Sequence, residues 1–355
     1  MFKNNNNSRQ GNIELLRILC MFFILIWHFN LNVILRNGDT SQALNYVALF
    51  ANSIAVVAVN TFVVISGYFS IKLKLKSIFG LLIQTEFFAV VAILVYILIA
   101  VVIKGEPFQK SSLLGLTPFH PSGLWFVPCY VQLLLLSPVL NWWCKSKKAH
   151  KVALLLLLGG GIMLYVSIGY KGYDLFNFIL LYLTGRWISL YPEKINRLSS
   201  KKLLILWLLS VVLTFILAVW WIYRGHGVSD KKIFEYSAPW VFISSVLLFL
   251  YFRSKSMDGK WILLISPSVF SVYLFHENSL IKQYVYIDPL KEILSSIPND
   301  VLSYCSLLLY GILLFVIVIV FDKFVRVKFQ DWLLRLLNRL EVWRIIDTNL
   351  KKLNE

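Results

Sequence analysis

The sequence predicts an all-α fold, a polytopic integral membrane helix bundle with about ten transmembrane helices. Three observations lead to this prediction. Of the 355 residues, 58% are hydrophobic and only 15% are charged, whereas soluble domains carry about a quarter charged residues. The mean hydropathy is +0.71. Apolar runs of roughly 17 to 25 residues recur along the chain, and each is long enough to cross about 30 Å of hydrocarbon as a helix.

The predicted spans follow one another with short connections and form one domain, residues 1–322. They cover roughly residues 13–35, 45–69, 77–103, 123–142, 152–168, 175–191, 203–222, 236–252, 261–281 and 301–321. The first span is preceded by an asparagine-rich polar segment and is not followed by a small-residue cleavage site. We therefore expect a retained span rather than a signal peptide.

The distribution of lysine and arginine predicts the orientation. The two termini and the connections on their side hold 25 of these residues, the opposite connections hold 9, and Arg17 lies within the first span. Because cytoplasmic loops carry the excess, both termini are predicted to be cytoplasmic. Contact with anionic lipid accounts for the net charge of +17, and no motif supports a nucleic-acid partner.

Residues 323–355 form a predicted cytoplasmic tail. Within FQDWLLRLLNRLEVWRII, apolar side chains recur at helical spacing with arginines between them, which predicts an amphipathic helix on the inner membrane surface. The four cysteines are scattered in or next to spans without the spacing of a metal site. We therefore expect no metal.

Two ionisable residues, Arg17 and His28, lie within the first predicted span. They are 11 residues apart, so on a helix they project within about 20° of one another and lie about 16 Å apart along the axis. Taken singly, Arg17 could extend to the inner headgroups and His28 could be a polar packing residue. Because both ionisable groups lie on one stripe of the helix, we favour the interpretation that this stripe lines a polar cavity.

Other spans and loops place polar groups at matching depths. On the inner side are Ser66, Gly67 and Arg186; near the middle is Glu86; on the outer side are His120 and His276, the latter at the depth of His28. Arginine binds phosphate and histidine can accept a proton at neutral pH. This pattern fits acyl transfer from a cytoplasmic phosphate-bearing donor to an external hydroxyl. A transporter or flippase uses the same residue types, and a sensor or scaffold would carry charges for topology alone.

Four segments resemble, in order, the signature segments of the membrane-bound acyltransferase-3 family, which O-acetylates bacterial surface glycans. They are NIELLRILCMFFILIWH (12–28), VNTFVVISGYF (59–69), LWFVPCYVQLLLLSPVLN (124–141) and SVYLFH (271–276). The resemblance covers about residues 12–320. It implies an acyl-CoA-dependent O-acyltransferase with acetyl-CoA as donor and a surface glycan or lipid-linked sugar as acceptor. It also implies a multi-pass protein of the bacterial plasma membrane, in contact with membrane lipid.

The resemblance also implies roles for individual residues. His28 matches the catalytic base and Arg17 the arginine needed for activity. The residues expected to bind acyl-CoA are Arg17, Ser66, Gly67, Lys72 and Arg186; those expected to bind the acceptor are His120, Trp125, Tyr130 and His276. Whether His28 acts as a base or is itself acetylated stays open.

The chain departs from the family pattern around the Ser-Gly pair. Phe62-Val63 replaces a Phe-Phe, and lysines at 72, 74 and 76 replace the usual arginines. Lysine acts as a point charge, so a bidentate phosphate clamp is not expected in that loop. The acceptor could be a capsule, a teichoic-type polymer, a lipid-linked oligosaccharide or peptidoglycan.

Overall fold

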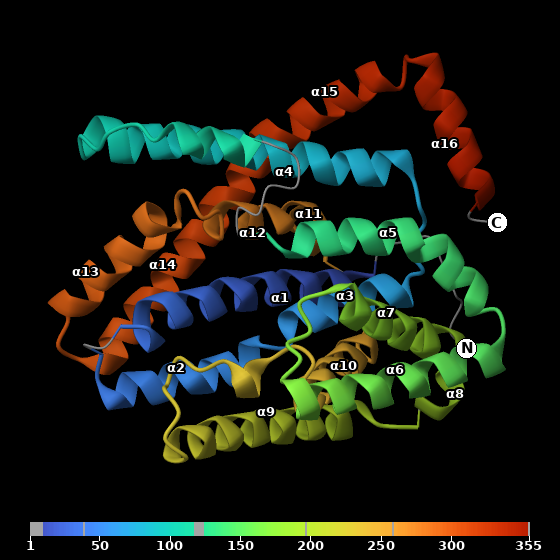
Figure 1. Ribbon diagram of the computed structural model, residues 1–355, viewed down its shortest axis with the longest axis horizontal. Coiled ribbons are helices and arrows are strands. Elements are labelled where there is room, and N and C mark those ends of the chain that lie inside the picture. Colours follow the sequence, from blue (N-terminus) through green and yellow to red (C-terminus); the bar gives the residue numbers. More distant parts are fainter. Residues whose placement is uncertain (1–9, 38–39, 117–123, 196, 258, 354–355) are drawn as a thin grey trace.

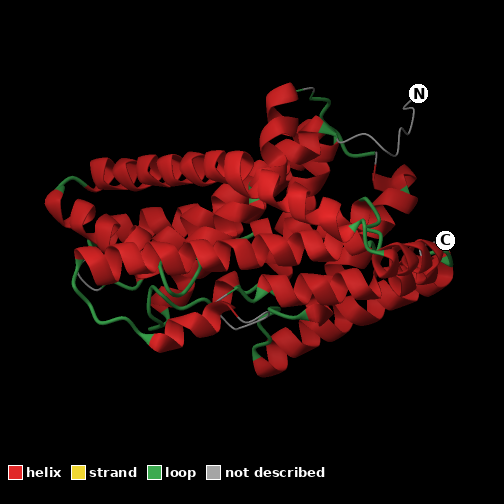
Figure 2. Ribbon diagram, turned by 90° about the horizontal axis from the view of Figure 1, so that it is seen from above, coloured by secondary structure: helices red, strands yellow, loops and turns green. Residues whose placement is uncertain are grey.

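Helices make up all the regular secondary structure in the part of the chain that the structure describes (Figure 2). The structure is a computed structural model that describes residues 10–37, 40–116, 124–195, 197–257 and 259–353. Its helices, with η marking π or 3-10 segments, are α1 (Gly11–Phe29), η1 (Asn30–Leu35), α2 (Gln42–Ala55), α3 (Ala58–Tyr68), α4 (Leu75–Tyr96), η2 (Ile97–Ile103), η3 (Lys110–Leu116), α5 (Phe126–Trp143), α6 (Lys147–Ile168), α7 (Leu175–Leu190), α8 (Pro192–Ile195), α9 (Ser200–Tyr223), η4 (Lys232–Phe234), α10 (Pro239–Arg253), α11 (Lys260–Ile265), η5 (Ser266–Ser268), α12 (Phe270–His276), η6 (Gln283–Ile287), α13 (Asp288–Ser296), α14 (Asp300–Phe321), η7 (Asp322–Arg326), α15 (Val327–Leu337) and α16 (Glu341–Leu353). The all-α prediction is confirmed.

Seven helical stretches among these residues are long and apolar enough to cross a membrane. Three shorter apolar stretches, Leu175–Leu190, Pro239–Arg253 and Lys260–His276, coincide with the sixth, eighth and ninth predicted spans. The last of them is broken at Pro267, whose ring cannot continue a regular helix. The total of ten spans and the orientation stay predictions.

Side-chain caps set the start of several helices. Ser41, Ser146, Asp174, Ser199 and Asn299 each accept a hydrogen bond from the backbone N–H three residues later. Each bond satisfies one of the donors that a helix N-terminus leaves unpaired. These caps lie in the short connections, so the sequence itself fixes where the apolar runs begin.

Helix α1 forms the centre of the bundle (Figure 1). It packs against α2, α3, α10, α11, α12 and α14. The start of α1 is tied to the end of α10, because the Asn12 side chain donates to the carbonyls of Phe252 and Lys255 at 2.9 Å. Figure 1 shows that α1 begins and α16 ends toward the same end of the bundle. We call this end inner and the opposite end outer.

Helices α3 and α7 approach each other unusually closely. A Cβ atom at Gly67 would lie 2.1 Å from the carbonyl oxygen of Tyr182, and one at Gly185 would lie 2.2 Å from that of Val64. Only glycine fits at both positions, as at other close helix crossings. This contact holds the inner half of α3, which carries Ser66, against α7.

The last helix continues beyond the tenth predicted span. The chain stays helical from Asp300 to Leu337, and α15 and α16 pack against α4. The Trp343 ring contacts the ring of Phe79 with centroids 4.8 Å apart. The amphipathic segment therefore lies against the inner end of α4 as well as presenting an apolar face outward.

Candidate active site

Two histidines from distant parts of the chain meet in the outer half of the bundle. His28 near the end of α1 and His276 at the end of α12 have their Nδ1 and Nε2 atoms, respectively, 3.0 Å apart. His276 is fully buried and His28 is half-buried. The structure thus brings together one predicted catalytic residue and one predicted acceptor-binding residue.

The surrounding hydrogen bonds assign the tautomer of each ring. Nδ1 of His276 lies 2.5 Å from the carbonyl oxygen of Val272, so this nitrogen carries the proton. Nε2 of His276 is then an acceptor, and Nδ1 of His28 must donate to it. Nε2 of His28 is left with a free lone pair, which is what a general base needs.

A carboxylate completes the group. Oε2 of Glu277 lies 3.1 Å from Nδ1 of His28, and its Oε1 accepts from Nζ of Lys282 at 2.9 Å. The contact with His28 has an ion-pair distance without hydrogen-bond alignment, so its effect on the ring is electrostatic. A nearby negative charge stabilises the imidazolium that forms when Nε2 takes a proton.

Packed aromatic rings hold this group in place. The Tyr286 ring lies edge-on to His276, with centroids 6.3 Å apart, and stacks on Phe29 at 4.7 Å. Its hydroxyl accepts a hydrogen bond from Asn32 at 2.7 Å. Rings fixed by packing and hydrogen bonds keep the geometry of a site without reorganisation.

The predicted acceptor residues of α5 lie in an aromatic wall facing α12. Phe126 stacks on Tyr130 with centroids 5.5 Å apart and contacts Tyr273 at 6.2 Å. Trp125, at the start of α5, stacks on Tyr236 at 5.6 Å. Tyr273 is three residues before His276, so this wall leads toward the histidines. Aromatic faces of this kind can pack against sugar rings.

Ser66 joins the inner half of α3 to this wall. Its hydroxyl donates to the carbonyl of Phe62 at 3.0 Å and lies 3.2 Å from the Tyr130 hydroxyl. Because the single Ser66 proton is already used, Tyr130 is the donor of the second bond. One predicted acyl-CoA residue and one predicted acceptor residue are therefore in direct contact.

Arginines gather at the inner end of the site. Arg17 forms an ion pair with buried Glu14 and lies over the Phe69 ring, 5.7 Å from its centroid. Arg253, which lies in none of the four signature segments, lies over the neighbouring Tyr68 ring at the same distance. Two guanidinium groups thus flank the end of α3, where a phosphate could be bound.

The comparison with protein families decides the assignment. The acyltransferase-3 model, described as an acyltransferase domain, matches residues 10–322. The chain belongs to this acyltransferase family. No curated protein and no solved structure matches the chain. The four signature segments quoted above lie within the matched residues, and the fold is that of a membrane protein with several apolar helices.

The other residues for which the family resemblance implies a role are not close to the two histidines in the sequence. Lys72 is exposed in the connection before α4. Arg186 lies on α7 next to the thiol of Cys144, and its Nε is buried without a hydrogen-bond partner among the described residues. His120 falls outside the described residues. The acyl-CoA and acceptor roles of these three residues stay predictions.

Gly67 has a structural reason to be glycine. Its Cα faces the backbone of α7, so a side chain there would separate α3 from α7. We expect Gly67→Ala to lower the free energy of unfolding by about 1–3 kcal/mol, as overpacking does. Gly159→Ala, at a position with open space around it, is the matched control in thermal unfolding. A rise in the KM for acyl-CoA without loss of stability would instead favour the predicted binding role.

A second polar group, missed in the sequence, anchors α12 from its inner end. Asp322 is fully buried and forms two hydrogen bonds with Arg326, at 2.7 and 2.5 Å. Ser271 of α12 donates to Asp322 and accepts from Gln84 of α4 at 2.8 Å. This cluster ties three helices together one turn and a half below His276. The i, i+4 spacing of Asp322 and Arg326 was a signal for it.

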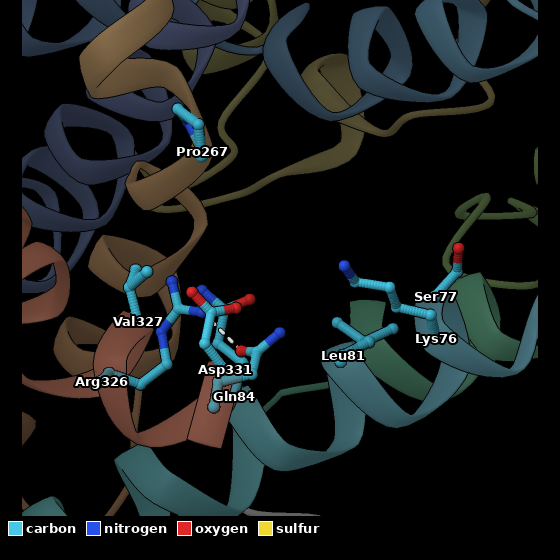
Figure 3. Close-up of a pocket in the computed structure, with 10 residues that line it drawn as sticks. Lys76, Ser77, Leu81, Gln84, Pro267, Arg326, Val327 and Asp331 are labelled. Atoms are coloured by element: carbon cyan, nitrogen blue, oxygen red, sulfur yellow. Dashed lines mark hydrogen bonds between the residues drawn. The ribbon is translucent and has the colours of Figure 1, made fainter. Parts of the chain in front are cut away.

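A cavity of about 360 Å³ opens beside this polar group (Figure 3). Lys76 and Ser77 lie on one side of it, and Arg326 and Asp331 lie on the other. Arg326 is already held by Asp322, and its Nη1 donates to Gln330 at 2.5 Å. Its guanidinium is thus committed to protein partners. Lys76 and Asp331 also line this space, and neither takes part in an ion pair among the described residues, so the space presents charges of both signs.

The three outer groups could in principle hold a metal ion. One ligand atom from each of His28, His276 and Glu277 lies within 4.8 Å of the others. Two imidazoles and a carboxylate are donors that zinc accepts. The sequence predicts no metal, and the effect of a chelator on acetyl transfer tests that prediction.

A buried carboxyl group in the outer loop before α10 predicts a pH effect. Burial raises the pKa of Glu235 from 4.5 to about 7, although the charges of Lys171, Lys231 and Lys232 oppose the shift. The folded state therefore binds this proton more tightly than the unfolded state, so the stability it contributes is present below pH 4.5 and is lost as the pH rises through 7.

We expect Glu235→Gln to remove this pH dependence. The variant should unfold at a higher temperature than the wild type at pH 8, and the difference should shrink at pH 5. Glu292→Gln, in exposed α13, is the matched control and should follow the wild type at both pH values. If Glu235→Gln changes the unfolding temperature by the same amount at pH 5 and at pH 8, the assigned protonation of Glu235 is wrong.

Proposed function

We propose that the protein transfers an acetyl group from cytoplasmic acetyl-CoA to a hydroxyl of a glycan or lipid-linked sugar on the outer side. Membership of the acyltransferase family supports the reaction class. The observation that carries the proposal is the arrangement of His28, whose Nδ1 faces His276 and Glu277 and whose Nε2 keeps its lone pair. This is the geometry of a general base held by an acidic partner.

The inner arginines support binding of the donor. Arg17 and His28 lie on one stripe of α1, about 16 Å apart along its axis. Phosphates held near Arg17 and Arg253 would leave the pantetheine arm to extend along α1 toward His28. Ser66 and Tyr130, which contact each other, lie on α3 and α5 and would border this path.

The reaction then proceeds by direct transfer. Nε2 of His28 takes the proton of the acceptor hydroxyl while the oxygen attacks the carbonyl carbon of the thioester. Glu277 stabilises the resulting imidazolium. The carbon–sulfur bond breaks as the tetrahedral intermediate collapses, and the imidazolium returns its proton to the departing thiolate. The products are the acetyl ester and CoA with a free thiol.

The test is transfer of radiolabel from acetyl-CoA to surface glycan in membranes that contain the protein. Membranes from the same host without the protein provide the background. Label in the glycan fraction that depends on the protein is the expected result. Movement of a glycan-lipid across the membrane without consumption of acetyl-CoA would contradict the proposal and favour the transporter alternative.

Chelation separates base catalysis from metal catalysis at the same three residues. Transfer should continue at the same rate after incubation with a strong chelator, because Nε2 of His28 needs no metal to accept a proton. Loss of transfer on chelation, followed by recovery on adding zinc, would show instead that His28, His276 and Glu277 hold a metal ion.

A further inference from the structure

Basic residues are scarce at the outer end of the bundle, yet they gather around the histidines. The nine lysines and arginines predicted for that side are Arg36, Lys104, Lys110, Lys171, Arg224, Lys231, Lys232, Lys282 and Lys291. We call Arg36, Lys171, Lys231 and Lys282 the outer cation group. They come from four separate segments of the chain, so the fold and not a local run of charge brings them together.

Electrostatic interactions connect this group with His28. The charges of Lys231, Lys282 and Arg36 all act on His28. Lys171 acts on both Lys231 and Glu235. Arg36 is also fixed in direction, because its Nη1 donates to Oδ1 of Asn32 at 2.8 Å, and Asn32 in turn bonds Tyr286 beside His276.

Most of this positive charge is not neutralised within the chain. Lys282 pairs with Glu277, but none of the ion pairs among the described residues involves Arg36, Lys171 or Lys231. The acidic groups that face the cluster are Glu235, Glu277 and Asp230. Glu235 is buried and Asp230 is engaged by His226 and Trp221.

Unpaired like charges that lie near one another in a partly buried position repel one another and are costly to hold. Burial and the charge of Arg36 lower the pKa of Lys231, as expected for such a position. An anionic ligand would remove this cost. Three cations contributed by different segments suit a phosphate, which can carry two negative charges and accepts hydrogen bonds from several directions.

We propose that the acceptor of this acyltransferase bears a phosphate group, which the outer cation group binds while the hydroxyl reaches Nε2 of His28. This inference rests on the proposed function, because it names the chemical class of its acceptor. The phosphate could belong to a lipid carrier or to the glycan itself. Both sources share the same recognition chemistry.

Binding of small probes to the purified full-length protein tests this directly. The probes are N-acetylglucosamine, N-acetylglucosamine 1-phosphate and octyl phosphate, with affinity measured by thermal stabilisation. The wild type should bind the sugar phosphate about tenfold tighter than the neutral sugar. One hydrogen bond to a charged group typically increases affinity by about tenfold or more. Added salt should weaken the preference.

The double variant Lys171→Gln with Lys231→Gln should lose most of this preference. The matched control, Lys104→Gln with Lys291→Gln, removes the same charge from the same end of the bundle away from His28 and should keep it. Tighter binding of octyl phosphate than of the sugar phosphate would point to a lipid carrier, and the reverse to a phosphate on the glycan.

Equal affinity for the charged and neutral sugars, absence of phosphate binding, or a preference that survives in Lys171→Gln with Lys231→Gln would overturn the inference. Because the readout is binding, it is independent of turnover. A preference for the sugar phosphate over the neutral sugar without acetyl transfer would contradict only the proposed function. Acetyl transfer without that preference would contradict only this inference.

Discussion

Replacing His28 with alanine should lower the rate of acetyl transfer by about 10²- to 10⁴-fold, the usual contribution of a general base. The expected loss follows from the free lone pair on Nε2 of His28 and from the support that His276 and Glu277 give to its Nδ1. The rate constant for transfer from labelled acetyl-CoA, normalised to the amount of folded protein, is the quantity to measure.

His226→Ala is the matched control for this variant. His226 is exposed, stacks on Trp221 with ring centroids 3.7 Å apart, and belongs to the loop after α9. Its removal should leave transfer within twofold of the wild type, roughly the scale of a neutral surface change. A His28→Ala protein that folds and retains more than a tenth of the wild-type rate would exclude His28 as the base.

Replacing Asp322 with alanine should lower the free energy of unfolding by about 3–5 kcal/mol, because it leaves the buried guanidinium of Arg326 without its partner. Asp322 is fully buried and Arg326 is only 5% exposed. Thermal unfolding in detergent reports the change. Transfer should fall as well, since Ser271 bonds Asp322 on the helix that ends at His276.

Two further variants make this prediction specific. Asp331→Ala removes an exposed carboxylate of α15, and it should have little effect on stability. Asp322→Leu combined with Arg326→Met should recover most of the loss, because an apolar pair can replace a buried ion pair at little cost. If Asp322→Ala and Asp331→Ala unfold at the same temperature, the buried pair does not stabilise the fold.

The sequence was informative where hydropathy and helical geometry suffice. Run lengths predict the helical bundle, and counting residues from the inner end predicts one depth for His28 and His276, in agreement with the 3.0 Å between Nδ1 of His28 and Nε2 of His276. Both inferences use the fixed rise per residue of a helix. They therefore do not depend on side-chain contacts.

Glu277 could not be found by the same reasoning. Adjacent residues on a helix point about 100° apart, so a continuous helix would direct Glu277 away from the site of His276. The structure ends α12 at His276 and gives Glu277 a non-helical backbone, with φ of −93° and ψ of 1°. This turn brings the carboxylate back to His28.

For a related reason, the sequence predicts that the last span ends before Asp322 and Arg326. Hydropathy places charged residues at the ends of spans, although two charges that satisfy each other can lie within a buried helix.

For Gly67, the sequence indicates a binding role but not the structural role. A family motif marked it as a binding residue, and its close approach to Tyr182 became apparent only from the packing of α3 on α7.

In the proposed mechanism, one site joins a donor from the inner end to an acceptor from the outer end. Sealed proteoliposomes test it most directly, with protein inserted in one orientation, radiolabelled acetyl-CoA on the side of the inner arginines and glycan acceptor on the other side. We expect labelled acceptor in the opposite compartment, and none when His28→Ala replaces the wild type. Label that appears only when donor and acceptor share a compartment would contradict it.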